Sequence, residues 1–306
     1  MKRTLLVMAL VGAVLLCAAP VLADDGFYVI VGGGGVGTKI TSLPLEIKNA
    51  GFYYLTGNLS YSGAGNGITV SSDQVTIDLM GFRLSGPGGG GSGSSYAIMI
   101  AGDKNVEVRN GSLNGWLAGV SDDGSGECNR AFNLRAENCW VGIDFESSGG
   151  NLVKGCSADG GNIGISINGG VATGNAVTNC NGTGISGYGT ISGNFLTNCG
   201  YGISGSGPGT ISGNSVTNCG HGIYGSGTIS GNSVNNCSQN GIYCYGASSI
   251  IGNTVVNPTS GTPKGINIAT PDPVLVTQNT VSGNTPASHF TGGGATINVA
   301  NTNAGF

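Results

Sequence analysis

The sequence predicts an all-β fold, a single-stranded right-handed parallel β-helix of about ten coils, and three observations lead to it. Of the 306 residues, 61 are Gly and only 8% are charged, yet 39% are hydrophobic, which is enough apolar material for a core. A motif of roughly 18 to 24 residues recurs between residues 141 and 284, a period typical of solenoids. Each copy contains three short apolar steps separated by Gly, Asn or Ser, a pattern of strands and turns without a helical stripe.

The repeat also predicts which residues stack. Equivalent strands of successive coils lie about 4.8 Å apart, and parallel crossovers are right-handed, so equivalent side chains should form files along the axis. One inward file should contain Ile165, Ile185, Ile203, Ile223, Ile242 and Ile266. A second should contain Val177, Leu196, Val216, Val234, Val255 and Val281. An amide ladder is expected at the bend through Asn175, Asn194, Asn214, Asn232, Asn253 and Asn284.

The parts of the chain can be assigned in order. Residues 1–23 have a basic start, an apolar run and small residues at the end, which predicts a signal peptide cleaved near Ala23. The mature chain is therefore expected to be secreted, to the periplasm or outside the cell. Residues 24–60 are expected to cap one end, and residues 61–306 to form the β-helix domain, with a last strand in "ATINVANT" (295–302).

The motifs resemble a known superfamily. "VTIDLMGFRLSG" (75–86), "NVEVRNGSL" (105–113) and the Gly-Ile and Gly-Asn coils that follow are similar to the right-handed parallel β-helix proteins of the pectin-lyase-like superfamily. The resemblance covers residues 50–285 and implies the fold. It implies no single activity, because that superfamily includes polysaccharide lyases and hydrolases, tailspikes, adhesins and uncharacterised secreted proteins.

Charge and hydropathy exclude two kinds of partner. Removal of Lys2 and Arg3 with the signal peptide takes the formal net charge from −4 to −6, and no cluster of basic residues is left to neutralise phosphates. Nucleic acid is therefore not an expected partner. After residue 23 no apolar run is long enough for a membrane span.

A Gly-His-Gly at 220–222 is similar to the one in polygalacturonase-like hydrolases of the superfamily, where paired aspartates precede it. Here no Asp, Glu, Lys or Arg occurs between Gly160 and Pro263, and a hydrolase needs two carboxylates. His221 also takes the repeat position held by Thr183, Tyr201 and Asn240 in sister copies. We interpret it as a repeat position and not as a catalytic residue.

The candidates for chemistry are charged residues at 117–159. The repeat alignment places Ser121 beside Asp144 and Asp123 beside Glu146, so Asp123, Asp144 and Glu146 are expected to share one outer face. Clustered carboxylates can hold calcium, and a pair can act as acid and base. The basic residues expected nearby are Arg130, Arg135 and Lys154. Because lyases of the superfamily use calcium-bound carboxylates with an Arg or Lys base, the resemblance makes calcium the one cofactor to consider, although the sequence requires none.

Five of the eight cysteines after the signal peptide follow Asn at one repeat position: Cys139, Cys180, Cys199, Cys219 and Cys237. We expect buried, reduced thiols, because ladder neighbours at about 4.8 Å are further apart than the Cβ separation near 3.8 Å of a disulfide. A Cys128–Cys139 or Cys237–Cys244 bridge stays open, and no cysteine spacing suggests zinc.

The uncharged coils offer a polar surface. Thr190, Thr210 and Thr228 are expected in one outward row and Ser192, Ser212 and Ser230 in another, an arrangement that can bind ice or glycans. The tyrosines that can stack on sugar rings are Tyr188, Tyr201, Tyr224, Tyr243 and Tyr245.

Three functions are compatible with these features. The first is a secreted, non-catalytic scaffold or binding protein for a polysaccharide or a cell-envelope component, which the long charge-free span favours. The second is a polysaccharide lyase or glycoside hydrolase that uses the acidic coils at 117–159. The third is an ice-binding protein that uses the Thr-x-Ser coils. The sequence leaves open whether the protein is an enzyme, what it binds and its oligomeric state.

Overall fold

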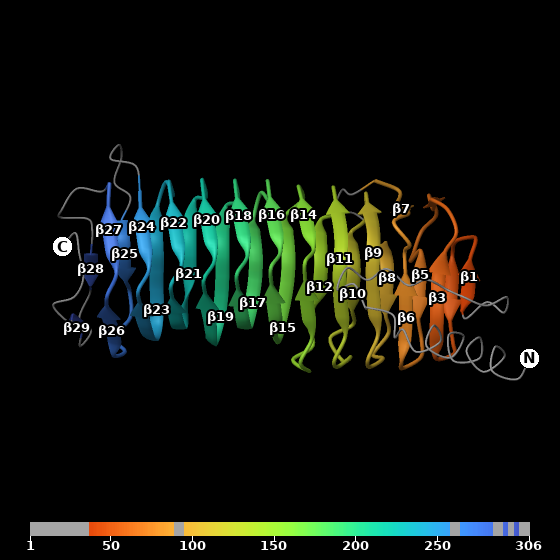
Figure 1. Ribbon diagram of the computed structural model, residues 1–306, viewed down its shortest axis with the longest axis horizontal. Coiled ribbons are helices and arrows are strands. Elements are labelled where there is room, and N and C mark those ends of the chain that lie inside the picture. The colour runs from red at the N-terminus through yellow and green to blue at the C-terminus, as the bar shows by residue number, and fades with distance from the viewer. Residues whose placement is uncertain (1–36, 89–94, 258–263, 284–289, 293–296, 300–306) are drawn as a thin grey trace, which may run out of the picture. The chain divides into compact units, whose positions relative to one another are not determined.

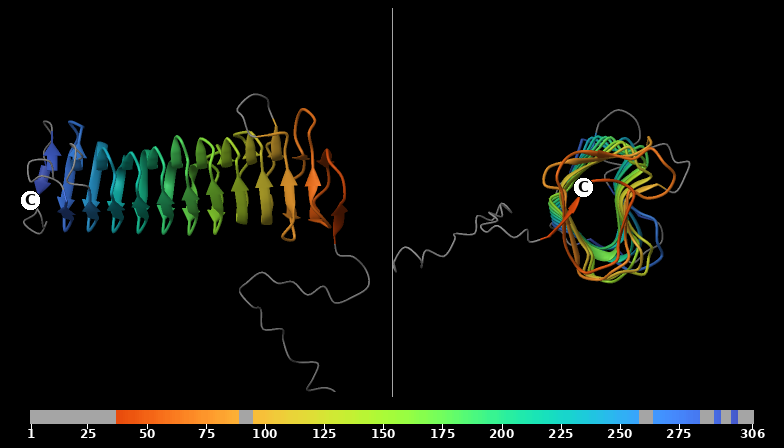
Figure 2. Two further views of the ribbon diagram at one scale, coloured as in Figure 1. Left: turned by 90° about the horizontal axis from the view of Figure 1, so that it is seen from above. Right: turned by 90° about the vertical axis from the view of Figure 1, so that its right-hand side faces the viewer.

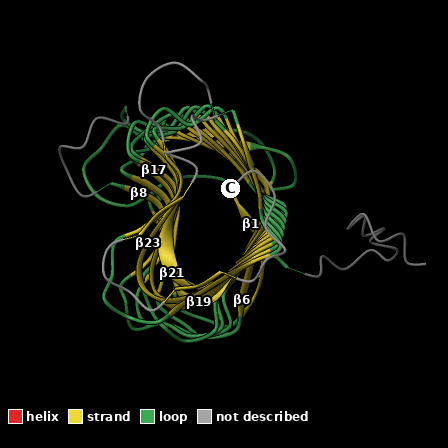
Figure 3. Ribbon diagram, turned by 90° about the vertical axis from the view of Figure 1, so that its left-hand side faces the viewer, coloured by secondary structure: helices red, strands yellow, loops and turns green. Residues whose placement is uncertain are grey.

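The computed structural model describes residues 37–88, 95–257, 264–283, 290–292 and 297–299, and residues 37–306 form one compact unit. In this part of the chain the structure contains strands and turns but no helix, and therefore no helix that could span a membrane. The strands follow one another along a single axis (Figure 1), and they enclose a continuous interior when seen along that axis (Figures 2 and 3). The predicted parallel β-solenoid of about ten turns is confirmed. The predicted signal peptide, 1–23, lies outside the described residues.

Every coil contributes to three parallel ladders, called sheets 1, 2 and 3. Sheet 1 consists of β2 (Leu45–Ile47), β5 (Ile68–Val70), β8 (Tyr96–Ile100), β10 (Ala118–Asp122), β12 (Val141–Phe145), the first parts of β15 (Ile163–Thr173), β17 (Thr183–Ser192), β19 (Tyr201–Ser212), β21 (His221–Ser230) and β23 (Asn240–Ile251), then β25 (Lys264–Ile268) and β28 (Phe290–Gly292).

Sheet 2 consists of β1 (Thr38–Ile40), β3 (Gly51–Leu55), β6 (Val75–Asp78), the first parts of β9 (Glu107–Asn114) and β11 (Arg130–Glu137), β13 (Leu152–Lys154), the last parts of β15, β17, β19, β21 and β23, then β26 (Val274–Thr277) and β29 (Ile297–Val299). Sheet 3 consists of β4 (Leu59–Ser60), β7 (Arg83–Ser85), the last parts of β9 and β11, β14 (Ser157–Asp159), β16 (Ala176–Thr178), β18 (Phe195–Thr197), β20 (Ser215–Thr217), β22 (Ser233–Asn235), β24 (Thr254–Val256) and β27 (Thr280–Ser282).

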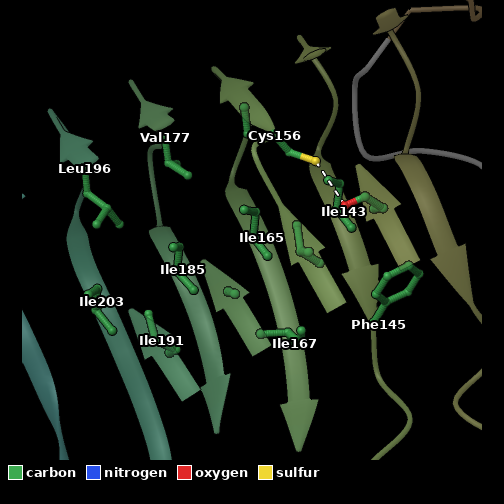
Figure 4. Packing of buried hydrophobic residues seen from close by; sticks show 14 of the residues in the cluster. Ile143, Phe145, Cys156, Ile165, Ile167, Val177, Ile185, Ile191, Leu196 and Ile203 are labelled. Carbon is green, nitrogen blue, oxygen red and sulfur yellow. Dashed lines mark hydrogen bonds between the residues drawn. The ribbon is translucent and has the colours of Figure 1, made fainter. Parts of the chain in front are cut away.

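The predicted inward files form the core. Ile165, Ile185 and Ile203 pair in register along sheet 1, and the file continues in both directions. Val177 pairs with Leu196 along sheet 3, and that file continues to Val281. All of these side chains are buried, and Figure 4 shows Ile165, Ile185 and Ile203 together with Val177 and Leu196 pointing into the same interior. The coils therefore stack in the register that the repeat predicts.

The amide ladder lies at the bend between sheets 2 and 3. Asn194 illustrates it: its Oδ1 accepts hydrogen bonds from the backbone N and the Nδ2 of Asn175, each at 2.9 Å, and its own Nδ2 donates to the Ala172 carbonyl at 3.0 Å. The same pattern repeats through Asn214, Asn232 and Asn253. The next rung is Asn279, which accepts from Asn253, whereas the expected Asn284 lies outside the described residues. Each rung satisfies polar groups that burial would otherwise leave unpaired.

The residue before each ladder asparagine has a left-handed backbone, and from Asn175 to Asn253 that residue is a glycine. Gly193, for example, has a φ of 63°, in the left-handed region that only glycine adopts without strain. The corner therefore favours a Gly-Asn pair, although Gln278, with a φ of 59°, takes the place of the glycine before Asn279.

All eight described cysteines are free thiols, and all except the exposed Cys128 are buried. Burial raises the pKa of Cys139 to about 11 and that of Cys156 to about 12, so both thiols are protonated at neutral pH. Cys156 lies in a different corner from the Asn-Cys file, since its backbone N donates to Asn175 Oδ1 and so begins the amide ladder. The cysteines pack as small apolar side chains.

Residues 37–60, expected to be part of a cap, contribute β1 to β4, which pair with strands of the next coil in all three sheets. The boundaries predicted at 60 and 61 remain a prediction.

Candidate functional site

The outer face of sheet 1 carries a continuous file of residues one coil apart. Asp144 pairs with Ser166, and the file continues through Ser186 and Ser204 to Tyr224 and Tyr243. These side chains point away from the core because they alternate with the buried isoleucines along each strand. The face therefore changes along the axis from a carboxylate, through serines, to aromatic rings.

An aromatic cluster, formed by Tyr201, His221, Tyr224, Tyr243 and Tyr245, occupies this face where the serines end. Tyr224 and Tyr243 stack with ring centroids 4.8 Å apart and planes 5° apart. Tyr201 and His221 form a second stacked pair at 4.9 Å and 10°. The pairs meet edge to face, with 5.7 Å between the centroids of Tyr201 and Tyr224. Such contacts each stabilise by about 0.5–1.5 kcal/mol, so the cluster holds its rings in fixed positions.

Two further contacts anchor the cluster. Tyr245 packs on Tyr224 with 5.0 Å between ring centroids, and its hydroxyl donates to the Gly205 carbonyl two coils away. Among the five rings, Tyr201 is the most exposed, at 37%; His221 stacks on one side of it, and Thr183 pairs with it in the preceding coil. The cluster thus presents one partly exposed ring, supported by its neighbours, to solvent.

His221 is a repeat position, as predicted. It pairs with Tyr201 in the preceding coil, and its Nδ1 lies 3.1 Å from Asn240 Nδ2 in the next. It is 9% exposed, and burial lowers its pKa, so the imidazole is held neutral between Tyr201 and the stacked tyrosines. Sequence reasoning placed His221 in the correct file but did not connect it with the tyrosines.

A second exposed ring lies at the same edge of sheet 1. Trp140, 44% exposed, immediately precedes β12, and its carbonyl accepts from the backbone N of Asn162. Asn162 is linked in turn to Gly182, and Gly182 to Tyr201. Trp140 and Tyr201 are therefore three coils apart, about 14 Å, with only small side chains at the positions between them. The sequence analysis missed Trp140, although the repeat alignment places it where later copies have Asn162 or Gly182.

The predicted acidic candidates do not all come together. Asp144 lies between Ser121 and Ser166, as predicted, and burial raises its pKa to about 6, with Glu146 and Asp122 adding to the rise. Glu146 is exposed just after β12. Asp123 instead accepts hydrogen bonds from Ser125 within its own turn.

Asp122 has a structural role that the sequence analysis did not assign. It is buried, and its carboxylate accepts from Ser147 Oγ at 2.6 Å, from the Glu146 backbone N at 2.8 Å and from Asn151 Nδ2 at 3.3 Å. These bonds tie two successive turns together.

The predicted basic residues face other directions. Arg130 and Lys154 belong to sheet 2, where Arg130 pairs with Glu107 and Leu152. Arg135 belongs to sheet 3 and donates from Nε to Ser112 Oγ at 3.0 Å. The six candidates thus lie on three sheets and their turns. Across the described ranges, no three His, Cys, Asp or Glu residues are placed to hold a metal ion.

The two polar rows on sheet 2 are in register. Thr190, Thr210 and Thr228 pair in one row and Ser192, Ser212 and Ser230 in the other. Val171 precedes the threonine row, and Ser249 and Ile251 follow the two rows, so the regular array spans three coils. The ice-binding alternative remains a prediction.

Comparison with known proteins identifies the fold. Residues 164–285 match the family model described as a right handed beta helix region. No curated protein matches the sequence. The catalytic domain of a GH87 alpha-1,3-glucanase in complex with nigerose is similar in structure, with a TM-score of 0.61 at 14% identity over 87% of this chain and 63% of that chain.

Two other solved structures are similar. The A-module of a mannuronan C-5 epimerase from Azotobacter vinelandii has a TM-score of 0.56 at 13% identity, over 84% of this chain and 91% of that one. The Dettilon tailspike protein has a TM-score of 0.50 at 15% identity, over 87% and 62%. The chain spans less than two thirds of the tailspike and of the glucanase domain. At these identities the likeness concerns the fold alone.

Proposed function

Because the chain has the right-handed parallel β-helix fold of the pectin-lyase-like kind, we propose that it is a secreted, non-catalytic protein that binds polysaccharide on the outer face of sheet 1. The observation that carries the proposal is the aromatic cluster, in which Tyr201 is 37% exposed while His221 stacks on one side of its ring. Two solved structures of the same fold are an alpha-1,3-glucanase domain in complex with nigerose and a mannuronan epimerase module, which supports a carbohydrate ligand.

The physical basis is the match between an aromatic face and the C–H face of a sugar ring. Both are apolar and flat, so packing one on the other removes water from both. His221 and Tyr224 hold Tyr201 in place before any ligand binds, which lowers the ordering cost of association. The half-buried serine side chains of the same face, Ser166, Ser186 and Ser204, can exchange hydrogen bonds with sugar hydroxyls.

The proposed absence of catalysis follows from the distribution of charged groups. A lyase that uses an Arg or Lys base needs that base beside its carboxylates, whereas Arg130, Lys154 and Arg135 belong to sheets 2 and 3. The coils that carry the aromatic cluster have no charged side chain from residue 160 to residue 263.

One observation favours a second candidate, a glycoside hydrolase. Asp144 has a pKa raised to about 6 and lies two residues from the exposed Glu146, and a carboxyl whose pKa is raised towards neutrality near a second carboxylate is the arrangement of a general acid. Release of reducing ends from a polysaccharide panel, abolished by Asp144→Asn, would establish this candidate and refute the non-catalytic proposal.

Affinity electrophoresis of the full chain through gels that contain a panel of polysaccharides tests the proposed function. We expect retardation by at least one polysaccharide, lost in Tyr201→Ala. Phe195→Ala is the matched control, since Phe195 is a 67% exposed aromatic residue on sheet 3 and should be dispensable. No retardation by any polymer, or equal effects of the two variants, would refute binding at the cluster.

A further inference from the structure

We propose that the surface on sheet 1 selects neutral polysaccharides and rejects acidic ones, and that Asp144 and Glu146 enforce the rejection. This inference rests on the proposed function and specifies its ligand class. The charged side chains on this face determine the selectivity, whatever the affinity for a neutral sugar.

The first argument is the lack of a counter-charge. No Asp, Glu, Lys or Arg occurs from residue 160 to residue 263, which includes every coil of the aromatic cluster. The outward file of sheet 1 presents Ser166, Ser186 and Ser204 and then tyrosines. A uronate carboxylate laid on these coils loses part of its hydration and gains no cation in return, a net cost. A neutral sugar has no such cost, because hydroxyls and aromatic edges replace its water.

The second argument is the negative end of the same file. Asp144 stands one coil before Ser166, in the same outward position. Glu146 follows two residues later and is exposed, and the buried carboxylate of Asp122 accepts from its backbone N. Neither Asp144 nor Glu146 forms a salt bridge within the described ranges, so their charge is not cancelled there. An acidic chain that extends from the cluster along the serines therefore meets like charges.

The cations near the Asp144 end of the face are directed elsewhere. Lys154 is on sheet 2, and Arg135, on sheet 3, donates to Ser112. Neither belongs to the part of sheet 1 along which the serines lie. Lys264 is a cation on sheet 1, but it pairs with Asn240 in the coil after the cluster, at the opposite end from Asp144, and so lies away from a chain that extends along the serines.

The test uses a polysaccharide that is retarded by the wild-type chain and the same polymer with its primary alcohols oxidised to carboxylates. We expect the oxidised form to bind at least tenfold more weakly at low salt, and the affinity for the neutral form to change less than twofold as salt is raised. Equal or tighter Tyr201-dependent binding of the oxidised polymer would overturn the neutral selectivity while leaving the proposed function intact. Binding of neither polymer in a Tyr201-dependent way would instead refute the proposed function.

A variant tests the role of the two carboxylates. Asp144→Ser with Glu146→Asn gives this coil the residues of the next one, Ser166 and Asn168. We expect its affinity for the oxidised polymer to rise several-fold and its affinity for the neutral polymer to stay within twofold. The control, Glu137→Gln with Asp159→Asn, removes the same charge from sheet 3 and should leave both affinities unchanged.

If the two double variants changed the affinity for the oxidised polymer equally, the net charge of the protein would account for the selectivity. That result would overturn the role of Asp144 and Glu146. Glu146→Gln alone, at an exposed position, keeps the test valid if the double variant folds poorly, and it should give a smaller change in the same direction.

Discussion

Tyr201 and His221 occupy the same position in successive coils, and their rings stack with centroids 4.9 Å apart and planes 10° apart. His221 is buried and supports the ring of Tyr201, which remains 37% exposed. If the proposed function is correct, the histidine of this Gly-His-Gly sequence supports a binding residue and takes no part in catalysis.

The stacking of Tyr201 on His221 can be tested by substitution of the buried residue, His221. His221→Ala should weaken polysaccharide binding about two- to tenfold, the equivalent of one aromatic contact of roughly 0.5–1.5 kcal/mol, because Tyr201 loses the ring that fixes it. His221→Phe keeps a ring at this position and should bind nearly as well as wild type. Affinity electrophoresis measures both, and equal affinities for the two variants would show that stacking plays no part.

His221 should also make stability depend on pH. Burial lowers its pKa, so the unfolded chain takes up a proton near pH 6.5 while the native chain resists it. The stabilisation is present above pH 6.5 and is lost as the pH falls towards the native pKa. Urea unfolding at pH 7.5 and pH 5.0 should therefore show a larger loss for wild type than for His221→Phe. The same loss in both proteins would mean that His221 is not held neutral by burial.

Asp144 should act in the opposite direction. Burial raises its pKa from an ordinary 3.8 to about 6, so the native chain holds the proton more tightly than the unfolded chain. The stability due to protonated Asp144 is full below about pH 4 and is lost as the pH rises through 6. Asp144→Asn should thus raise the free energy of unfolding at pH 7.5 more than at pH 4.5. A variant less stable than wild type at pH 7.5 would reveal a stabilising contact of the ionised carboxylate.

The amide ladder should contribute strongly to stability. Asn214 is buried, accepts two hydrogen bonds from Asn194 and donates to the Ile191 carbonyl and to Asn232. Asn214→Ala leaves several of these groups unpaired and should lower the free energy of unfolding by about 2–4 kcal/mol. Asn235→Thr, on the outside of sheet 3 where the preceding coil has Thr217, should change it by less than about 0.5 kcal/mol. Similar effects of the two changes would contradict the ladder.

The thiols allow a direct check of burial. In the native protein a thiol reagent should modify Cys128 quickly and the seven buried cysteines only after denaturation. A titration with Ellman's reagent, before and after addition of guanidinium chloride, measures this. Two or more fast thiols would contradict the burial, and fewer than eight thiols in the denatured chain would reveal a disulfide among them.

Much of the fold could be predicted because a solenoid repeats its local chemistry. The period placed Ile185 on Ile203 and Asn194 on Asn214, and one correct alignment fixes the register of every neighbouring coil. The prediction of the last ladder residue was wrong, because the repeat is less regular at that end. Asn279 follows Gln278 and not the usual glycine, so the Gly-Asn signal pointed to Asn284 instead.

The site was harder to predict because it depends on side-chain directions at the ends of strands. The alignment correctly set Asp144 beside Ser121, but the chain turns after Asp122, so that Asp123 contacts Ser125 and Asp122 becomes buried. The tyrosines were recognised separately. Their assembly around His221 depends on ring angles that a repeat period does not contain.

The most direct test of the account is a crystal structure of the full chain with a neutral oligosaccharide taken from a polysaccharide that binds. The account predicts a sugar ring packed on the exposed face of Tyr201, on the outside of sheet 1, with further sugars along the Ser204 side of the cluster. An ordered oligosaccharide on sheet 2 or sheet 3, with the face of Tyr201 left in solvent, would contradict it.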